Sequence, residues 1–521
     1  MFHFQVCATM AAIIVDFQNC FIFILLSLFS LLCYRVLVKK QNPSGYDLPP
    51  SPPALPLIGH LHLLLSTKPH ESIQKLFSKY GPLLHLRVFN IPFVLVSSAS
   101  VANEMCKTHD VSLSSHGTLG IDESLLFGSS SFLMAPYGAY WKFLKKLAVT
   151  TMTGPQALER SRGIRAKEIA RFHSKLLRKA RNNESVEIEL EAMKLTSNII
   201  CSMSMGRRFS EDNGEAEKLR GLVTETFILM KKITLTVILR KPLEKLGISP
   251  FKKEIMGLSQ RFEELLERIL KEHEEKPDVH QGSVMMDALW TAYLDSNAEF
   301  RITRKEMKSF LVDILIGGID TTVEAIQWTM AEILNNHKIL ERLREEIESV
   351  VGEKRLIEET DVPNLPYLQA VVKEGLRLHS PFFFVSRILQ ESCKIGGFYV
   401  AAETPIVVNA YAVMRDPENW ECPCEFKPER FLASGEEDER KEQAMKFIPF
   451  GYGRRACPAS NMALTSIGIA IGTMVQGFDW RIQGENICMK EASGLMTLKM
   501  ARPFTCTLVA RGQYLSTSDF L

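Results

Sequence analysis

A ten-residue stretch near the C-terminus constrains this chain more than any other feature. Residues 450–459 read FGYGRRACPA, and the apolar segment 460–475 follows them directly. Because proline is favoured at the first position of a helix, Pro458 predicts a buried helix that begins just after Cys457. The backbone N–H groups and the dipole at that helix N-terminus would favour a thiolate, the form in which cysteine binds metal ions. Cys457 is therefore the first candidate for a metal ligand.

The residues before Cys457 support this interpretation. Gly451 and Gly453 permit a tight turn that would direct backbone donors towards the sulfur. Arg455 adds a fixed cation of the kind that pairs with carboxylates. A Cys-Pro dipeptide alone carries no information, but the combination of Phe450, Gly453, Arg455, Cys457 and a small residue at position 459 is specific.

The other cysteines indicate neither a disulfide framework nor a zinc site. The chain has 521 residues and eleven scattered cysteines, an odd number, whereas disulfide frameworks occur in short chains with paired cysteines. The Cys422-Pro-Cys424 sequence is too short for a zinc knuckle and has no second pair nearby.

A second constraint is the apolar segment 11–38. Its part from residue 11 to residue 34 spans about 24 residues, enough to cross a bilayer as a helix, although Asp16, Gln18 and Asn19 interrupt it. Basic residues follow it at positions 35, 39 and 40, which would place the rest of the chain in the cytosol. A cleaved secretory signal is the alternative, but no basic region precedes the segment and no small-residue cleavage site is evident. We expect an uncleaved transmembrane anchor, whether translation starts at Met1 or at Met10.

The remainder of the chain predicts one large body behind a stiff connector. Residues 39–56 are basic and then proline-rich, ending in LPPSPPALP, and prolines hold an extended backbone. Residues 57–512 show no break in composition, so we expect a single catalytic domain there and a short tail at 513–521.

Within that body the pattern is mainly α with small β-sheets. The β-branched and alternating runs 83–88 and 93–97 predict a hairpin, and residues 395–413 predict short strands broken by Gly396-Gly397. Amphipathic periodicity predicts the long helices between these strands, at residues 157–182, 218–239, 252–275, 305–335 and 339–351.

The predicted helix 305–335 contains the sequence Gly317-Gly318-Ile-Asp320-Thr321-Thr322. Two glycines in the middle of a helix cost about 1 kcal/mol each against alanine, so they mark a kink or the close approach of another group. The Thr321 hydroxyl can bond back to the Gly317 carbonyl and open the helical ladder. We expect a groove there, with a hydroxyl and an acid beside it.

Two further pairs have helical spacing. Glu374 and Arg377 lie three residues apart and so share one helix face. Trp141 and Lys145 lie four residues apart and do the same. Such pairs are common on protein surfaces and are worth little there, so each carries weight only in combination with the other motifs.

Taken together, these motifs resemble the cytochrome P450 family. The haem-binding signature of that family has the form of residues 450–459, and its oxygen-binding motif matches residues 317–322 at every position. The resemblance covers residues 48–512 with the motifs in family order, and it implies the cytochrome P450 fold with an N-terminal transmembrane helix.

The resemblance also implies roles for individual residues. Cys457 would be the axial thiolate of haem b (iron protoporphyrin IX), with Phe450, Gly453 and Arg455 shaping the loop around it. Asp320 and Thr321 would deliver protons during the activation of dioxygen. The remaining residues would hold the cofactor or the fold: the haem propionates would bind Trp141, Lys145 and Arg387, and a buried structural triad would contain Glu374, Arg377 and Arg430.

The wording of several motifs, among them Phe426-Lys-Pro-Glu-Arg430-Phe431, is similar to plant microsomal enzymes of the A-type group, which includes flavonoid and triterpenoid oxidases. The closest similarity is to the branch linked to triterpene (thalianol-type) metabolism. The chain departs from the common pattern at Ala459, where the family usually has glycine, and at Ser380, where the group usually has proline. A bulky stretch, Phe382 to Phe384, follows Ser380.

The expected activity is that of an endoplasmic-reticulum mono-oxygenase of secondary metabolism, which inserts one oxygen atom from O2 into a lipophilic triterpenoid or flavonoid-like substrate or desaturates it. By family position, mostly apolar segments would line the substrate pocket, at residues 114–132, 227–239, 309–321, 382–385 and 493–496. Which carbon is oxidised stays open.

The chain carries no nucleotide-binding motif of its own. We therefore expect an external electron donor, NADPH–cytochrome P450 reductase, with cytochrome b5 as a second donor. Basic residues could form the docking face, namely Lys142, Lys145, Lys146 and Arg454. The net charge of +2 gives no indication of nucleic-acid binding. Two alternatives stay open, a haem-thiolate isomerase or dehydratase that needs no O2 and a non-catalytic membrane haem protein.

Overall fold

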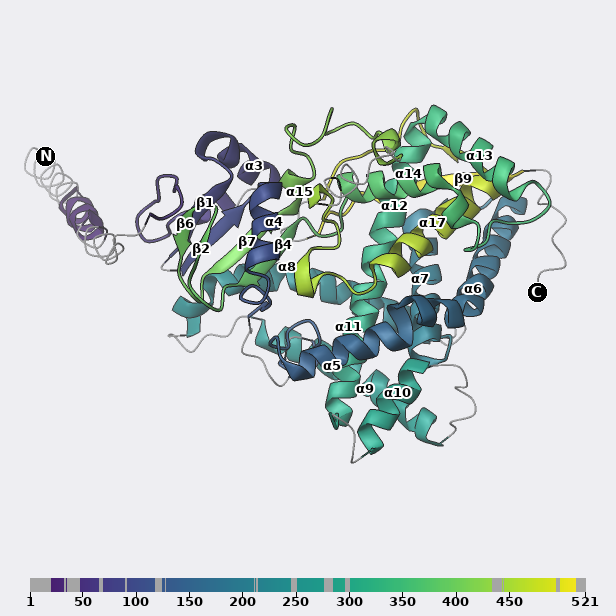
Figure 1. Ribbon diagram of the computed structural model, residues 1–521, viewed down its shortest axis with the longest axis horizontal. Coiled ribbons are helices and arrows are strands. Elements are labelled where there is room, and N and C mark those ends of the chain that lie inside the picture. The colour runs from purple at the N-terminus through teal and green to yellow at the C-terminus, as the bar shows by residue number, and fades with distance from the viewer. Residues whose placement is uncertain are drawn as a thin grey trace, which may run out of the picture.

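The computed structural model describes residues 20–31, 34, 47–64, 69–89, 91–117, 124–126, 128–209, 211, 214–244, 251–275, 284–295, 300–432, 443, 445–492 and 497–511. Figure 1 shows a sheet-containing part with α3 (Pro69–Tyr80) and α4 (Ala99–Thr108) beside it, and a larger part built from helices. The predicted class, mainly α with small β-sheets, is confirmed.

The largest sheet has four strands in the order β1-β2-β7-β4. Strands β1 (Leu83–Val88) and β2 (Ile91–Val96) form the predicted hairpin, and β2 pairs in parallel with β7 (Pro405–Asn409). Strand β4 (Phe384–Ile388) runs antiparallel to β7, with Arg387 opposite Ile406. The sheet thus carries Arg387, the predicted propionate ligand, at its edge strand.

Two smaller sheets lie elsewhere. Strands β5 (Cys393–Ile395) and β6 (Phe398–Val400) form a hairpin across the predicted Gly396-Gly397 break. Strands β3 (Ser185–Glu187), β9 (Thr505–Ala510) and β8 (Phe478–Ile482) form the third sheet, in that order. The expected run of short strands to residue 413 is wrong at its end, because Ala410–Val413 forms one helical turn, α15, capped by the Asn409 side chain.

The helical part contains the predicted helices with shifted ends. It comprises α2 (Leu61–Leu64), α5 (Ala139–Ala148), α6 (Pro155–Arg181), α7 (Ile188–Met205), α8 (Glu215–Glu244), α9 (Lys252–Glu275), α10 (Val284–Leu294), α11 (Arg304–Gly318), α12 (Asp320–Asn335), α13 (His337–Val351), α14 (Pro366–Leu378) and α17 (Ser460–Gly477). Short π- and 3-10 turns join them, at Val149–Thr153, Val362–Asn364, Pro428–Phe431 and Gly453–Arg455.

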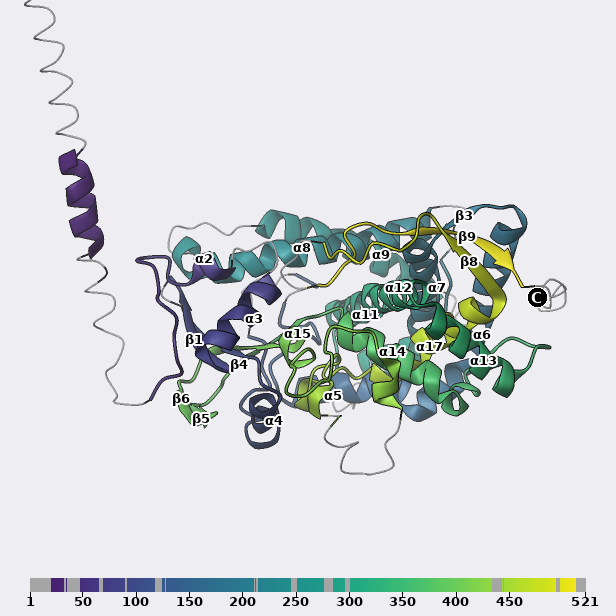
Figure 2. The ribbon, with the colours of Figure 1, turned by 90° about the horizontal axis from the view of Figure 1, so that it is seen from above.

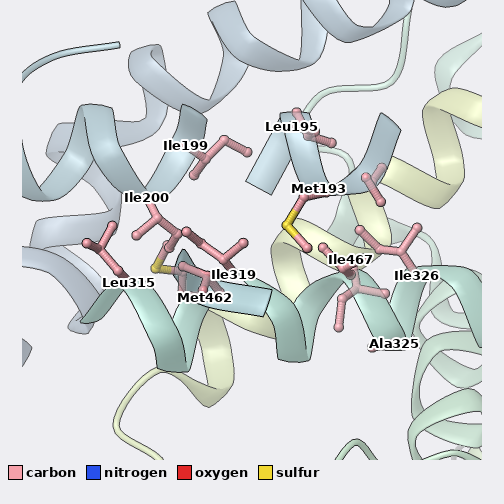
Figure 3. Packing of buried hydrophobic residues seen from close by; sticks show 14 of the residues in the cluster. Met193, Leu195, Ile199, Ile200, Leu315, Ile319, Ala325, Ile326, Met462 and Ile467 are labelled. Carbon is pink, nitrogen blue, oxygen red and sulfur yellow. The ribbon is translucent and has the colours of Figure 1, made fainter. Parts of the chain in front are cut away.

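The largest hydrophobic cluster lies where α7, α11, α12 and α17 meet (Figure 3). Ile199 and Ile200 of α7 approach Leu315 and Ile319 there, and Met462 of α17 comes close to the same point. A side chain at Gly318 would lie 2.7 Å from Cδ1 of Ile200. Gly318 is therefore required by the close approach of α7, as the mid-helix glycine pair predicts.

The predicted helix 305–335 is divided in two at Ile319. Helix α11 ends at Gly318, and α12 begins at Asp320 after the backbone of Ile319 departs from regular helical geometry (φ −88°, ψ −73°). The N-terminal half begins with a capping box, in which Thr303 accepts from the Glu306 N–H and the Glu306 side chain accepts from the Thr303 N–H. The break places Gly317 and Thr321 on either side of one irregular turn.

Residues 20–31 form a helix whose large apolar side chains are exposed, Phe21 at 60% and Phe29 at 65% among them. This helix stands apart from the body in both views (Figures 1 and 2). Among the described residues, no helix has both the length and the apolar character needed to cross a membrane. Most of the predicted anchor at 11–38, the start of the hinge and the tail at 513–521 lie outside the described residues.

Candidate functional site

The loop that carries Cys457 is a tight turn closed by backbone hydrogen bonds. The Cys457 N–H donates to the Phe450 carbonyl (2.9 Å), and the Gly451 N–H donates to the Ile448 carbonyl (3.1 Å). Gly453 opens the 3-10 turn in between with a φ of +67°. A Cβ at Gly453 would lie 2.2 Å from Oδ1 of Asp110, so this position excludes any larger residue.

One detail of the predicted loop is wrong. Helix α17 begins at Ser460, and Pro458 and Ala459 form a turn before it, so Pro458 is not the first helical residue. Burial raises the pKa of the Cys457 thiol, whereas a hydrogen bond from the Ala459 N–H and the charge of Lys145 lower it. The residue Cys457 is exposed to solvent, but the protein packed around its sulfur still reduces the solvation of a thiolate. The donor aimed at the sulfur is thus the amide of the turn, and alanine at position 459 supplies it.

Arg455 is bound by backbone carbonyls from a distant part of the chain. Its Nε donates to the Ser114 carbonyl (2.7 Å), and its two Nη atoms donate to the carbonyls of Phe132 and Ala135. The guanidinium carbon lies 4.4 Å from the centre of the Trp141 ring. Burial, with a contribution from Arg387, lowers the pKa of Arg455 to about 10.

Trp141 and Lys145 share one face of α5, as predicted. Trp141 is buried, and the Lys145 ammonium lies 5.2 Å from the centre of its ring. The same ammonium donates to the Arg454 carbonyl (2.6 Å), which belongs to the cysteine loop. Lys145 therefore ties α5 to that loop.

Arg387 lies close to a residue that the sequence analysis missed, His116. The Nη1 of Arg387 donates to the Ser386 carbonyl (2.8 Å) and lies 3.5 Å from Nδ1 of His116. Burial and then Arg387 hold the pKa of His116 well below its usual range. No local pattern around residue 116 distinguishes this histidine, since its partner is 271 residues away.

These cations fit the propionate groups of haem b. Arg387 is close enough to Arg455 to contribute to lowering the pKa of Arg455, and His116, whose pKa is also lowered by burial and by both arginines, is neutral beside them. Among the described residues, no carboxylate hydrogen-bonds to either arginine. A buried cation without an anionic partner is costly, and an anionic group at this place would remove that cost.

The irregular turn between α11 and α12 has the geometry that the glycine motif predicts. The Thr321 hydroxyl donates to the Gly317 carbonyl (2.6 Å), and the Thr322 hydroxyl donates to the Gly318 carbonyl (2.9 Å). Gly317 is exposed and Thr321 partly so, whereas residues 322–331 are all buried. This one turn thus has an accessible hydroxyl on a face of the helix that is otherwise enclosed.

Asp320 has a different environment from the one expected. Its side chain is 1% exposed and forms an ion pair with Lys499 (2.9 Å), which also pairs with Glu324 at 2.9 Å. Burial raises the pKa of Glu324 to about 8, against the lowering effect of Lys499. Burial also raises the pKa of Glu189 beside them. The acid next to Thr321 is therefore part of a buried cluster of two carboxylates and one shared lysine, and Lys499 and Glu324 are residues that the motif alone did not identify.

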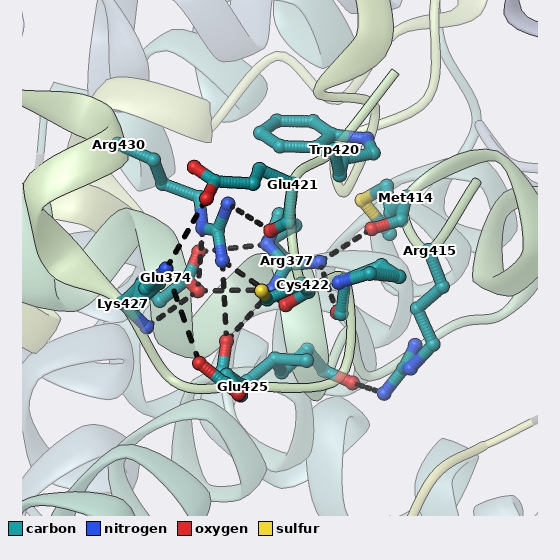
Figure 4. Close-up of polar contacts among 12 residues, drawn as sticks. Glu374, Arg377, Met414, Arg415, Trp420, Glu421, Cys422, Glu425, Lys427 and Arg430 are labelled. Carbon is teal, nitrogen blue, oxygen red and sulfur yellow. Dashed lines mark hydrogen bonds and ion pairs between the residues drawn. The ribbon is translucent and has the colours of Figure 1, made fainter. Parts of the chain in front are cut away.

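Glu374, Arg377 and Arg430 form the predicted buried triad (Figure 4). Glu374 and Arg377 are completely buried, and Glu374 accepts from Arg377 Nε (2.7 Å), Arg377 Nη2 (2.9 Å) and Arg430 Nε (2.9 Å). The remaining donors of Arg377 reach carbonyls of the following segment, Met414 at 2.6 Å and Pro423 at 2.8 Å. The triad thus binds α14 to residues 414–430, the segment that leads to the cysteine loop.

The predicted pocket-lining segments are described only in part. Phe383 is 1% exposed and is a core residue, whereas Phe382 and Phe384 are half-buried. The rings of Phe382 and Phe227 lie 6.3 Å apart, which brings α8 to the start of β4. The Ser380 hydroxyl donates to the Phe382 carbonyl (2.9 Å) and so stabilises the turn before β4. Residues 493–496 and the side chains of 233–239 lie outside the described residues.

Comparison with known proteins agrees with this geometry. The cytochrome P450 family description matches residues 49–507. The chain is 62% identical to cytochrome P450 705A22 of Arabidopsis thaliana, over 96% of this chain and 98% of that protein. It is 37% identical to 3,9-dihydroxypterocarpan 6A-monooxygenase of Glycine max, over 91% of this chain and 95% of that protein. The chain belongs to the cytochrome P450 family, whose members are mono-oxygenases that use haem b with an axial cysteine thiolate.

Proposed function

We propose that Cys457 is the axial ligand of haem b in this mono-oxygenase and that the substrate is a lipophilic secondary metabolite. The observation that carries the assignment of the site is the set of cations around the cysteine loop. Arg387 and Arg455 lack a hydrogen-bonded carboxylate among the described residues, and Lys145 is bound to the loop itself. Arg387 and Arg455 would pair with the two propionate groups of haem b, and Cys457 would bind its iron.

When bound, haem b supplies the chemistry that activates dioxygen. The protein residues hold and move protons beside it. Thr321 presents a hydroxyl on the accessible face of the α11–α12 turn, and because that hydroxyl donates to the Gly317 carbonyl, its oxygen is left to accept a hydrogen bond from a group in the site. Asp320, the adjacent residue, is bound by Lys499 at 2.9 Å, and it would have to separate from Lys499 and take up a proton from solvent before it could pass that proton into the site. The hydrogen bond from the Ala459 N–H would stabilise the negative charge of the Cys457 thiolate.

A triterpenoid or flavonoid-like molecule is the proposed substrate. One described contact of the predicted pocket segments is apolar, since Phe227 is buried and its ring lies 6.3 Å from that of Phe382, and an apolar contact surface disfavours a substrate with unpaired polar groups. One relative carries a pterocarpan substrate in its name, which supports a polycyclic substrate of similar character. Screening such compounds for a substrate-induced change of the haem spectrum would test the class, and a lack of response to both classes would contradict it.

The electrons are proposed to come from NADPH–cytochrome P450 reductase, with cytochrome b5 as a second donor. Lys142, Lys146 and Arg454 are exposed and lie on α5 and the cysteine loop, so they form a cationic surface next to Cys457. Reversing the charge in Lys142→Glu should slow reduction by added reductase and weaken its dependence on salt, because opposite charges steer association. Unchanged reduction rates would exclude this docking surface.

The N-terminal segment 11–38 is proposed to anchor the protein in the endoplasmic reticulum membrane, with the proline-rich hinge 39–56 leading to a cytosolic catalytic domain, residues 57–512. The exposed apolar side chains of residues 21–31 support this proposal, because they would be covered by lipid. Alkaline carbonate extraction of microsomes should leave the full chain in the membrane and release a chain that begins at residue 39. Release of the full chain would contradict the anchor.

The ferrous–CO spectrum tests the haem-thiolate site directly. Wild-type protein should show the Soret shift that a thiolate ligand produces, and Cys457→Ser should lose it. Cys424→Ser is a matched control, because Cys424 is also exposed but lies outside the loop. A shift that survives Cys457→Ser would overturn the assignment of the ligand. Turnover that persists without NADPH and reductase would instead favour the isomerase or dehydratase alternative.

A further inference from the structure

Asp313 is a carboxylate on α11 that the proposed chemistry does not use. It lies one helical turn before Gly317, and both of its oxygens accept from the Ser131 hydroxyl (3.0 and 2.9 Å). It also accepts from the backbone N–H groups of Phe132 and Leu133. Among the described residues, no cation pairs with this carboxylate. Asp313 therefore directs its negative charge at the N–H groups of a single turn, residues 131–135.

The carbonyl groups of the same turn are bound from the opposite side. Arg455 of the cysteine loop donates to the carbonyls of Phe132 and Ala135. The turn thus lies between an anion that holds its N–H groups and a cation that holds its carbonyl groups. Peptide dipoles align in such a field, and charge-assisted hydrogen bonds are stronger than neutral ones. The negative charge of Asp313 and the positive charge of Arg455 therefore each strengthen the hydrogen bonds that the other forms with these peptide groups.

The turn also contacts Trp141, which the proposed haem site assigns to the propionates. The Phe132 ring stacks on the Trp141 ring, with centroids 5.7 Å apart and planes 8° apart. Its edge meets Phe310 of α11 at 5.9 Å. Trp141 in turn contacts the Arg455 guanidinium. A displacement of residues 131–135 would therefore move both Arg455 and Trp141.

We propose that Asp313 is a positioning residue for the cofactor: by holding the turn 131–135, it fixes Arg455 and Trp141 at the haem propionates and couples them to helix α11. This inference rests on the proposed haem site. Burial raises the pKa of Asp313 to about 7, although Ser131 and the two backbone N–H groups lower it. A carboxylate kept in so unfavourable a place without a cation is consistent with a positioning role.

A double-mutant cycle between Asp313→Asn and Arg455→Lys tests the coupling. The readout is the rate at which haem transfers from the purified holoprotein to an acceptor protein. Asp313→Asn alone should speed haem loss by about tenfold, the effect of weakening a charged hydrogen bond. In the Arg455→Lys background the same change should have less than about a threefold effect, because lysine keeps the charge but lacks the forked guanidinium donors that bind the Phe132 and Ala135 carbonyls. Effects that multiply would overturn the proposal.

Ser309→Ala is the matched control. The Ser309 hydroxyl donates from the same helix to the Leu125 carbonyl (2.6 Å), so its removal costs a buried hydrogen bond without touching the turn. Ser309→Ala should change the rate of haem loss by the same factor in the wild-type protein and in the Arg455→Lys variant. A cycle for Ser309 that is as non-additive as that for Asp313 would show a general loosening of the protein and would overturn the specific role of Asp313.

A second measurement covers the case in which Asp313→Asn or Arg455→Lys does not accumulate as holoprotein. Ser131→Ala removes the hydroxyl donor and leaves the two backbone donors in place. Resonance Raman bands of the haem propionates should shift in Ser131→Ala and not in Ser309→Ala. Unshifted bands in Ser131→Ala would refute the proposal. Wild-type protein that binds no haem would overturn the proposed site as well, whereas unshifted bands in a haem-containing protein would overturn the role of Asp313 alone.

Discussion

Replacing Glu374 by glutamine should destabilise the protein by roughly 3–5 kcal/mol, because it leaves the fully buried guanidinium of Arg377 and the largely buried one of Arg430, which is 10% exposed, without their anion. One carboxylate oxygen accepts three hydrogen bonds, from Arg377 Nη2, Arg430 Nε and the Lys427 N–H, and the other accepts one, from Arg377 Nε. A glutamine oxygen can keep the first three, but its amide group then faces the Nε donor of Arg377. A lost charged hydrogen bond contributes about 1.5–3 kcal/mol of the total, and the uncompensated charge supplies the rest.

The assay is chemical denaturation followed by far-UV circular dichroism, together with the haem content of the purified protein. Folded proteins are stable by about 5–15 kcal/mol, so Glu374→Gln should lower the transition midpoint strongly and reduce the yield of haem-containing protein. Full burial of Glu374 and Arg377 is the reason for the large expected effect.

Glu429→Gln provides the control within the same segment. Glu429 pairs with Arg342 at 2.7 Å, but both side chains are about half exposed, at 50% and 47%. Exposed pairs contribute about 0–1 kcal/mol, so this variant should resemble wild type. If Glu374→Gln were as mild as Glu429→Gln, the argument that the triad holds the approach to the cysteine loop would be refuted.

Three further changes test other parts of the structure. Gly375→Ala should cost about 1–3 kcal/mol in unfolding free energy, because its Cβ would lie 2.2 Å from the Thr329 hydroxyl, and Thr329→Ala should recover part of that loss. Thr321→Ala should lower the product formed per NADPH consumed by about a hundredfold, in line with the loss of a proton-transfer group. Thr321→Ser keeps the hydroxyl and should restore the yield. Equal yields for the alanine and serine variants would exclude a role of this hydroxyl in proton transfer. Burial raises the pKa of Glu324 from 4.5 to about 8, so above pH 4.5 the folded state keeps a proton that the unfolded state releases. The contribution of protonated Glu324 to the free energy of unfolding is therefore complete below pH 4.5 and is lost as the pH rises through 8. The stability of wild type relative to Glu324→Gln should therefore fall between about pH 4.5 and pH 8 in urea titrations and level off above pH 8. Lys499 stays charged over this range because Glu324 and Asp320 raise its pKa against the effect of burial. A constant difference would contradict the raised pKa of Glu324.

Local features of the fold could be predicted from the sequence because they depend on neighbouring residues. The hairpin β1–β2 and the helix α9 follow from side-chain alternation and periodicity within a few turns of chain. The bond from Thr321 to Gly317 spans four residues, and the pair Glu374–Arg377 spans three. The apolar segment 460–475 forms α17 from its first residue, but Pro458 is not the first helical residue, because Pro458 and Ala459 form a turn in which the Ala459 N–H donates to Cys457.

The partners of the site residues could not be predicted, because tertiary folding brings them from far along the chain. Arg455 finds its carbonyl acceptors 320–341 residues earlier, and Asp320 finds Lys499 179 residues later. His116 and Asp313 carry no local pattern that distinguishes them from structural residues. The motifs of the sequence by themselves predicted which cysteine, which turn of helix and which triad to examine, because each motif lies within a few neighbouring residues. Only the tertiary structure decided which charges are paired, because desolvation and ion pairing depend on every chain segment packed around a group and not on its neighbours in sequence.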